Sequence, residues 1–99
     1  MAAIPLDQFV AFVRTLEGEV IQTRGAGRSH FTVRVLDRGL EFTPQSTRTP
    51  RGHTFAYTQR VLDQFAETQS WTTTDYRFTV NASYQLTLID RFLAARKDG

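Results

Sequence analysis

The stretch HFTVRVLDRGLEFT, residues 30–43, decides the fold class. Phe31, Val33 and Val35 alternate with polar side chains, which predicts a strand that is buried on one face and wet on the other. A second alternating run starts at Leu40, after the turn-forming residues DRG. The two runs therefore predict an antiparallel hairpin whose apolar face packs against a helix.

The parity of the side chains restricts how these two strands pair. A three-residue loop would place Phe42 opposite Arg34, and the apolar faces of the two strands would then disagree. We therefore expect Val35 opposite Phe42, with a two- or four-residue turn around residues 38–39. The outer face of the sheet then carries Arg34 and Thr43 as cross-strand neighbours.

The sequence before the hairpin predicts a helix and one further strand. Residues 5–17 carry apolar side chains at the spacing of an amphipathic helix. Pro5 suits the first turn of this helix, and Gly18 suits its end. Glu19–Thr23 is rich in strand formers and is followed by the turn-rich segment RGAGRS. We therefore expect a third antiparallel strand between the helix and the hairpin.

The sequence after the hairpin predicts two more helices. Residues 54–68 carry apolar side chains at helical spacing, and Thr54 is a suitable N-cap. Residues 81–96 are apolar around more than half of the helix, which is typical of a helix packed on two sides. Residues 71–80 fit either a strand or a helical turn.

The expected fold is a single small α+β domain over residues 1–99. It has an N-terminal helix, a three-stranded antiparallel meander and two C-terminal helices packed on one face of the sheet. The chain length suits one hydrophobic core. The sequence has no cysteine, so this core is expected to form without a disulfide.

Positive charge is concentrated in the middle of the chain. The net charge is +2, yet residues 22–60 hold seven arginines against two acidic residues. Arginine presents a planar fork that pairs with phosphate and carboxylate groups, so we expect contacts with a nucleic-acid backbone. The competing interpretation is a solvated face. The candidate nucleic-acid-binding residues are Arg24, Arg28, Arg34, Arg38, Arg48, Arg51 and His53.

The segment QSTRTPRGHTF, residues 45–55, is predicted as the connection between the sheet and the second helix. Its hydroxyl groups and the guanidinium groups of Arg48 and Arg51 are those that proteins use on phosphate oxygens. The helix start near Thr54 adds a partial positive charge. The segment is thus either a phosphate contact or a solvated connection.

Two alternative functions fit the same sequence. Glu19–Thr23, as an edge strand, could pair with another protein or form a homodimer by strand addition. Trp71, Tyr76 and Phe78 lie among threonines and could line a small-molecule pocket, although such aromatic clusters more often anchor a core. The leading prediction remains a binding domain for nucleic acid.

No stretch of the sequence reaches the specificity of a catalytic or cofactor signature. The serines lie outside the Gly-x-Ser-x-Gly pattern, and His30 and His53 alone are too few ligands for a zinc site. We therefore expect a non-enzymatic domain without cofactor or metal. The N-terminus lacks the features of a secretory signal, and no segment is apolar over the about 18 residues that a membrane span needs. These observations favour a cytoplasmic protein without a membrane partner.

Overall fold

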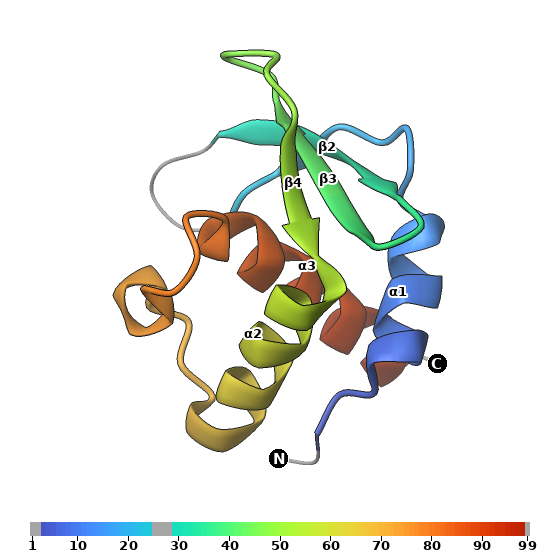
Figure 1. Cartoon of the computed structure of the whole chain (residues 1–99). Coiled ribbons are helices and arrows are strands. Elements are labelled where there is room, and N and C mark those ends of the chain that lie inside the picture. Colours follow the sequence, from blue (N-terminus) through green and yellow to red (C-terminus); the bar gives the residue numbers. More distant parts are fainter. Residues whose placement is uncertain (1–2, 25–28, 99) are drawn as a thin grey trace.

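The computed structural model describes residues 3–24 and 29–98, which form an α+β domain (Figure 1). The helices are α1 (Leu6–Arg14), α2 (Phe55–Thr68), α3 (Ala82–Asp98) and the short 3-10 helix η1 (Thr73–Tyr76). The strands are β1 (Ile21–Gln22), β2 (His30–Val35), β3 (Gly39–Pro44) and β4 (Arg51–Thr54). The predicted fold class is confirmed.

The antiparallel sheet of the described residues has four strands, in the order β1-β2-β3-β4, and not the three that we predicted. The additional strand β4 lies within the segment that the sequence analysis treated as a connection. Its inward-facing residues, Arg51 and His53, are not apolar, and Gly52 between them has no side chain. The hydrophobic alternation that marks β2 is therefore absent from β4, and periodicity does not reveal it.

The β2–β3 hairpin keeps the predicted faces but shifts its register by two residues. Val35 lies opposite Leu40, and Arg34 lies opposite Glu41, not Thr43. The turn closes with a 2.8 Å hydrogen bond from the Leu36 amide to the Gly39 carbonyl, so the two-residue turn lies one position earlier than expected.

Gly39 explains this shift. It belongs to β3 and pairs with Thr54, and a Cβ atom at this position would meet the backbone carbonyl of His53. Glycine is therefore required inside the sheet, where β4 approaches closely, and not in the turn.

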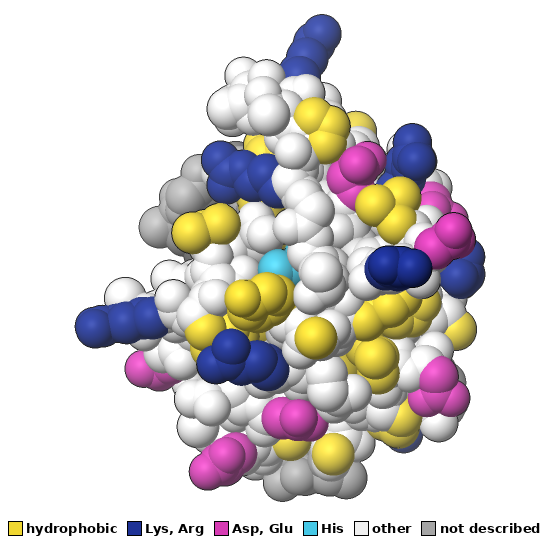
Figure 2. Space-filling view, viewed as in Figure 1, with side chains coloured by type: hydrophobic (Ala, Val, Ile, Leu, Met, Phe, Trp, Pro, Cys, Tyr) yellow, Lys and Arg dark blue, Asp and Glu magenta, His cyan; other side chains and the backbone are white. Residues whose placement is uncertain are grey.

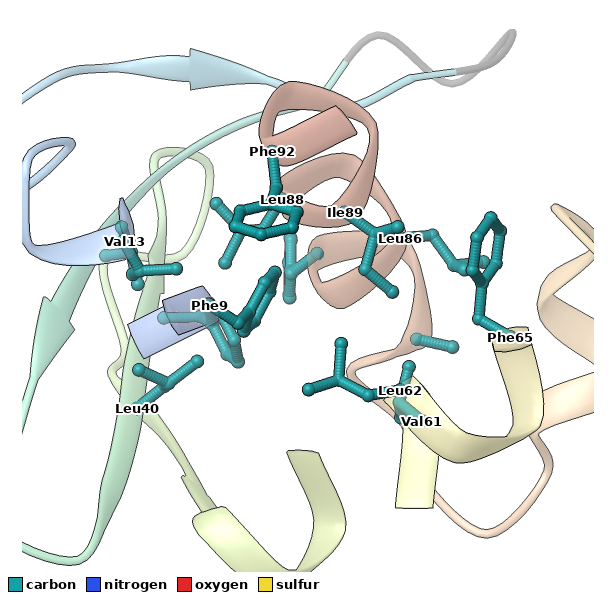
Figure 3. Close-up of a cluster of buried hydrophobic side chains, with 14 of the residues drawn as sticks. Phe9, Val13, Leu40, Val61, Leu62, Phe65, Leu86, Leu88, Ile89 and Phe92 are labelled. Atoms are coloured by element: carbon teal, nitrogen blue, oxygen red, sulfur yellow. The ribbon is translucent and has the colours of Figure 1, made fainter. Parts of the chain in front are cut away.

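The three α-helices cover one face of the sheet, and no described element covers the other (Figure 1). The hydrophobic core lies between this inner face and the helices (Figure 3). The sheet contributes Phe31, Val33, Leu40 and Phe42, each at most 1% exposed. The helices contribute Phe9, Val13, Val61, Leu62, Phe65, Leu86, Leu88 and Ile89.

The three predicted helices are confirmed, with small changes at their ends. α1 ends at Arg14, three residues earlier than predicted, and a hydrogen-bonded turn follows it. Thr54 is the N-cap residue of α2, but its side chain makes no capping hydrogen bond. Residues 71–80, which fitted a strand or a helical turn, contain η1.

Candidate functional site

The sheet register places two of the candidate arginines on opposite faces. Arg34 is on the outer face, where its Nε lies 4.0 Å from Oε1 of Glu41. Arg51 pairs with the core residue Phe42, and because cross-strand partners share a face, Arg51 belongs to the inner side. These two guanidinium groups therefore do not form one surface.

Arg24 is held by the C-terminal part of the chain. Its amide donates a 3.0 Å hydrogen bond to the hydroxyl of Thr87, and its Nε lies 3.5 Å from Oδ2 of Asp90. Its guanidinium carbon lies 4.1 Å from the centre of the Trp71 ring. This arginine therefore already has partners within the domain.

Two further candidate arginines, Arg38 and Arg48, lie beyond opposite ends of β3. Arg38 is an exposed turn residue whose carbonyl accepts a 3.0 Å hydrogen bond from the amide of Phe55. Arg48 is exposed in the β3–β4 loop and adopts a left-handed conformation, with φ of 57°. Arg28 lies outside the described residues. Nucleic-acid contact through the whole arginine set stays a prediction, and the arrangement of its members lends it little support.

The aromatic residues predicted to line a pocket also have different surroundings. Trp71 is half-buried and packs on Phe65, with ring centres 4.7 Å apart. Tyr76 is fully buried, and its hydroxyl donates a 2.7 Å hydrogen bond to the carbonyl of Ser70. Burial raises the pKa of Tyr76. Phe78 of this set lines a pocket beside the sheet.

This pocket lies between strand β4, the first turn of α2 and the segment before α3, and we call it the β4 pocket. Its volume is about 290 Å³. Figure 2 views the molecule from the side of β4 and α2, and a histidine side chain is visible there between hydrophobic side chains, with Lys or Arg side chains around them. The pocket is lined mainly by Gly52, His53, Tyr57, Phe78, Thr79 and Val80.

Aromatic side chains form the walls of the β4 pocket, and an arginine packs against two of their rings. Tyr57 stacks on His53, with ring centres 5.5 Å apart and planes at 30°. The guanidinium carbon of Arg60 lies 4.1 Å from the centre of the Phe78 ring and 5.9 Å from that of Tyr57. Val80 is 84% exposed at the rim. The pocket thus has exposed apolar surface, with a cationic group beside it.

A buried polar cluster forms the floor of the pocket. Nε2 of His53 lies 2.8 Å from the hydroxyl of Thr79, and Nδ1 contacts both the side-chain amide of Gln85 and the hydroxyl of Thr58. The Gln85 amide also donates a 3.0 Å hydrogen bond to the Thr58 hydroxyl. Gln85 and Thr58 are both fully buried. Four elements of the chain are therefore tied together at His53.

The surroundings of His53 favour the neutral ring. The Gln85 amide nitrogen is placed as the donor to Nδ1 of His53, and with this assignment the ring proton is on Nε2, facing the Thr79 hydroxyl. Burial lowers the pKa of His53, because the charged form would lose its hydration. The histidine that the sequence analysis assigned to phosphate contact is therefore only 7% exposed and is engaged in the fold.

Strand β4 is an edge of the sheet, and the backbone of Gly52 points away from the sheet. The Phe55 amide bonds to the Arg38 carbonyl, and in an antiparallel ladder hydrogen-bonded pairs alternate. Leu40 and His53 are thus a hydrogen-bonded pair, whereas Gly52 occupies the intervening position. The N–H and C=O of Gly52 consequently face the open edge, beside the β4 pocket.

The outer side of the same edge is also hollowed. A depression of about 200 Å³ lies over Gly39 and Gly52, which have no side chains to fill it. Leu36 and Arg38 flank this depression. The free edge of β4 is therefore bordered by a hollow on each face of the sheet.

Sequence reasoning missed most of this site. Tyr57, Arg60 and Val80 were not among the predicted site residues, because their spacing resembles that of an ordinary amphipathic helix and a loop. The signal available in the sequence was an aromatic residue, Tyr57, placed one helical turn before Arg60.

Comparisons with protein-family models, with curated proteins and with solved structures gave no match. Over residues 3–24 and 29–98, no group of three or more His, Asp or Glu side chains is placed to hold a metal ion. Within the same ranges, no helix has the length and apolar character that crossing a membrane requires.

Proposed function

We propose that this chain is a non-enzymatic protein-interaction domain that binds an extended segment of a partner at the open edge of β4. The observation that carries the proposal is the position of Gly52, whose backbone donor and acceptor face outward between two hollows. An added strand would bond to these groups, and its alternating side chains would enter the two hollows.

The other edge of the sheet is less suited to strand addition. β1 has two residues, Ile21–Gln22, and the chain on both sides of it is attached to α3. Arg24 bonds to Thr87, and Oε1 of Glu19 lies 3.2 Å from Nη1 of Arg91. The predicted edge strand, Glu19–Thr23, is therefore held at both ends by the protein's own helix α3. For this reason we place strand addition at β4.

The polar cluster under the pocket supports a binding role. Its hydrogen bonds fix β4, α2 and α3 relative to one another, so a partner would meet a preformed surface. A preformed surface loses little conformational entropy on binding, which favours affinity. Tyr57 and Val80 add exposed apolar area beside the edge.

Selection from a displayed library of random peptides tests this proposal. Two variants at one position separate backbone pairing from other effects. Gly52→Pro removes the N–H that an added strand needs, whereas Gly52→Ala keeps it, and a Cβ atom at this position has no neighbour within 4 Å. Because the Gly52 N–H makes no ladder bond, proline there leaves the β3–β4 pairing intact.

We expect peptides that bind the natural chain and Gly52→Ala but lose binding to Gly52→Pro. Circular dichroism should show that both variants are folded. Peptides that bind all three proteins equally would contradict strand addition at β4, as would a library without any selected peptide.

A further inference from the structure

We infer that the segment bound at β4 carries an apolar side chain and an acidic side chain separated by one residue. This inference rests on the proposed function and adds the chemistry of the partner. It follows from which side of the sheet each residue of an added strand would face, and from the groups already present there.

The register of an added strand follows from the backbone of β4. Its main hydrogen bonds would be made to the N–H and C=O of Gly52. The partner residue opposite Gly52 shares the face of Gly52, which is the outer face. The two residues beside it lie opposite Arg51 and His53 and must therefore point to the inner side.

The residue opposite His53 meets the β4 pocket. The walls there are the rings of Tyr57 and Phe78, with Val80 at the rim. These side chains offer apolar contact, and the polar atoms of His53 are already engaged by Thr79 and the Gln85 amide. A leucine-sized or aromatic side chain fits these apolar walls, whereas a charged side chain would lose hydration on entering them.

The residue opposite Arg51 meets a cationic group. Arg51 is exposed and has no ion-pair partner among the described residues, and the same is true of Arg60. No acidic side chain lines the β4 pocket in the described part of the chain. An aspartate or glutamate in the partner would pair with Arg51 as a cross-strand neighbour.

The middle residue, opposite Gly52, is not restricted. Gly52 has no side chain, and the depression on the outer face leaves room above it. The sheet is antiparallel throughout, so an added antiparallel strand continues its pattern. In that direction the partner motif reads, from N- to C-terminus, apolar residue, any residue, acidic residue.

The test uses nine-residue peptides with this motif at the centre of a threonine-rich sequence, titrated into isotopically labelled protein and followed by amide NMR shifts. One peptide carries Phe-Thr-Glu, a second Phe-Thr-Lys and a third Glu-Thr-Phe. We expect Phe-Thr-Glu to bind best, and the lysine peptide to bind several-fold more weakly. A single-stranded oligothymidylate is the nucleic-acid probe.

A charge exchange sharpens the test. Arg51→Glu should invert the preference, so that Phe-Thr-Lys binds more tightly than Phe-Thr-Glu. Arg34→Glu, on the opposite face of the sheet, is the matched control and should leave the preference unchanged.

The other outcomes contradict the motif, the strand direction or the class of partner. Equal binding of the glutamate and lysine peptides, lost in Gly52→Pro, would overturn the motif and leave strand addition standing. Glu-Thr-Phe as the best peptide would overturn the antiparallel direction. No binding of any peptide would overturn the motif, while the library selection decides separately on strand addition. Binding of the oligothymidylate alone would overturn the inference in favour of nucleic acid.

Discussion

Nε2 of His53 lies 2.8 Å from the hydroxyl of Thr79, and this contact joins the edge strand β4 to the segment before α3, 26 residues later in the chain. Together with Gln85 and Thr58, the pair forms the polar floor of the β4 pocket. The proposed binding edge is therefore held in place by a buried hydrogen-bonded cluster as well as by the hydrophobic core.

His53→Ala should lower the free energy of unfolding by about 2–3 kcal/mol, because it removes one hydrogen-bond partner each from the buried amide of Gln85 and the hydroxyl of Thr79. Chemical denaturation followed by circular dichroism measures this change. His30→Ala, at an exposed position of β2, is the control and should change the free energy by less than about 0.5 kcal/mol. Equal effects of the two substitutions would show that the cluster adds no stability.

The same cluster predicts a pH dependence of stability. The pKa of His53 is lowered in the folded state, so the unfolded chain binds more protons than the folded chain just below the ordinary histidine pKa of about 6.5. The stabilisation is fully present above about pH 6.5 and is lost as the pH falls towards the pKa of the folded state. Urea unfolding at pH 7.5, 6.5, 5.5 and 5.0 measures this loss. We expect the free energy of unfolding to fall by at most about 1.4 kcal/mol per pH unit.

Replacement of His53 by glutamine tests the assignment of this pH dependence. His53→Gln should remove the part of the slope below about pH 6.5, whatever its effect on stability at neutral pH. A slope that survives unchanged in His53→Gln would contradict the assignment to His53.

Two glycines of the sheet should respond in opposite ways to alanine. Gly39→Ala places a Cβ atom against the backbone carbonyl of His53, so one of the two strands must shift, at a cost of about 1–3 kcal/mol. Gly52→Ala meets no atom within 4 Å and should change the free energy of unfolding by less than about 0.5 kcal/mol. Thermal unfolding of both variants measures the difference. A stable Gly39→Ala protein would contradict the close approach of β3 and β4.

Much of the fold could be predicted from the sequence because its elements carry periodic apolar side chains. β2 and β3 alternate, and the three helices repeat at helical spacing, so their existence and the buried face of the hairpin were predicted. The register was wrong by two residues because the sequence does not show that Gly39 is needed for the approach of β4. From the sequence alone, a glycine beside a turn fits equally well in the turn and in the strand.

The candidate site was less predictable for a different reason. Its residues come from β4, α2 and the segment before α3, and only the packing of these elements brings them together. Charge suggested Arg34 and Arg51 as partners, yet the sheet separates them onto two faces. His53 was predicted to contact nucleic acid, and the amide that contacts its ring, Gln85, lies 32 residues away.

Arg60→Ala should weaken binding of an acidic peptide without much effect on stability. Arg60 is exposed, and its contact with the Phe78 ring is expected to contribute less than about 1 kcal/mol to folding. Peptide titration and thermal unfolding of one sample measure both quantities. Arg14→Ala, on the exposed side of α1, is the control for a loss of charge far from the pocket. Equal loss of affinity in both variants would indicate a general charge effect.

The most direct test of binding at the β4 edge compares Gly52→Pro with Gly52→Ala in an NMR titration with the best peptide from the library. The proposal predicts that Gly52→Ala binds like the natural chain, with amide shifts centred on Gly52, Thr54 and Tyr57, and that Gly52→Pro remains folded and does not bind. Equal affinity of the two variants, or shifts centred on the outer face around Arg34, would contradict it.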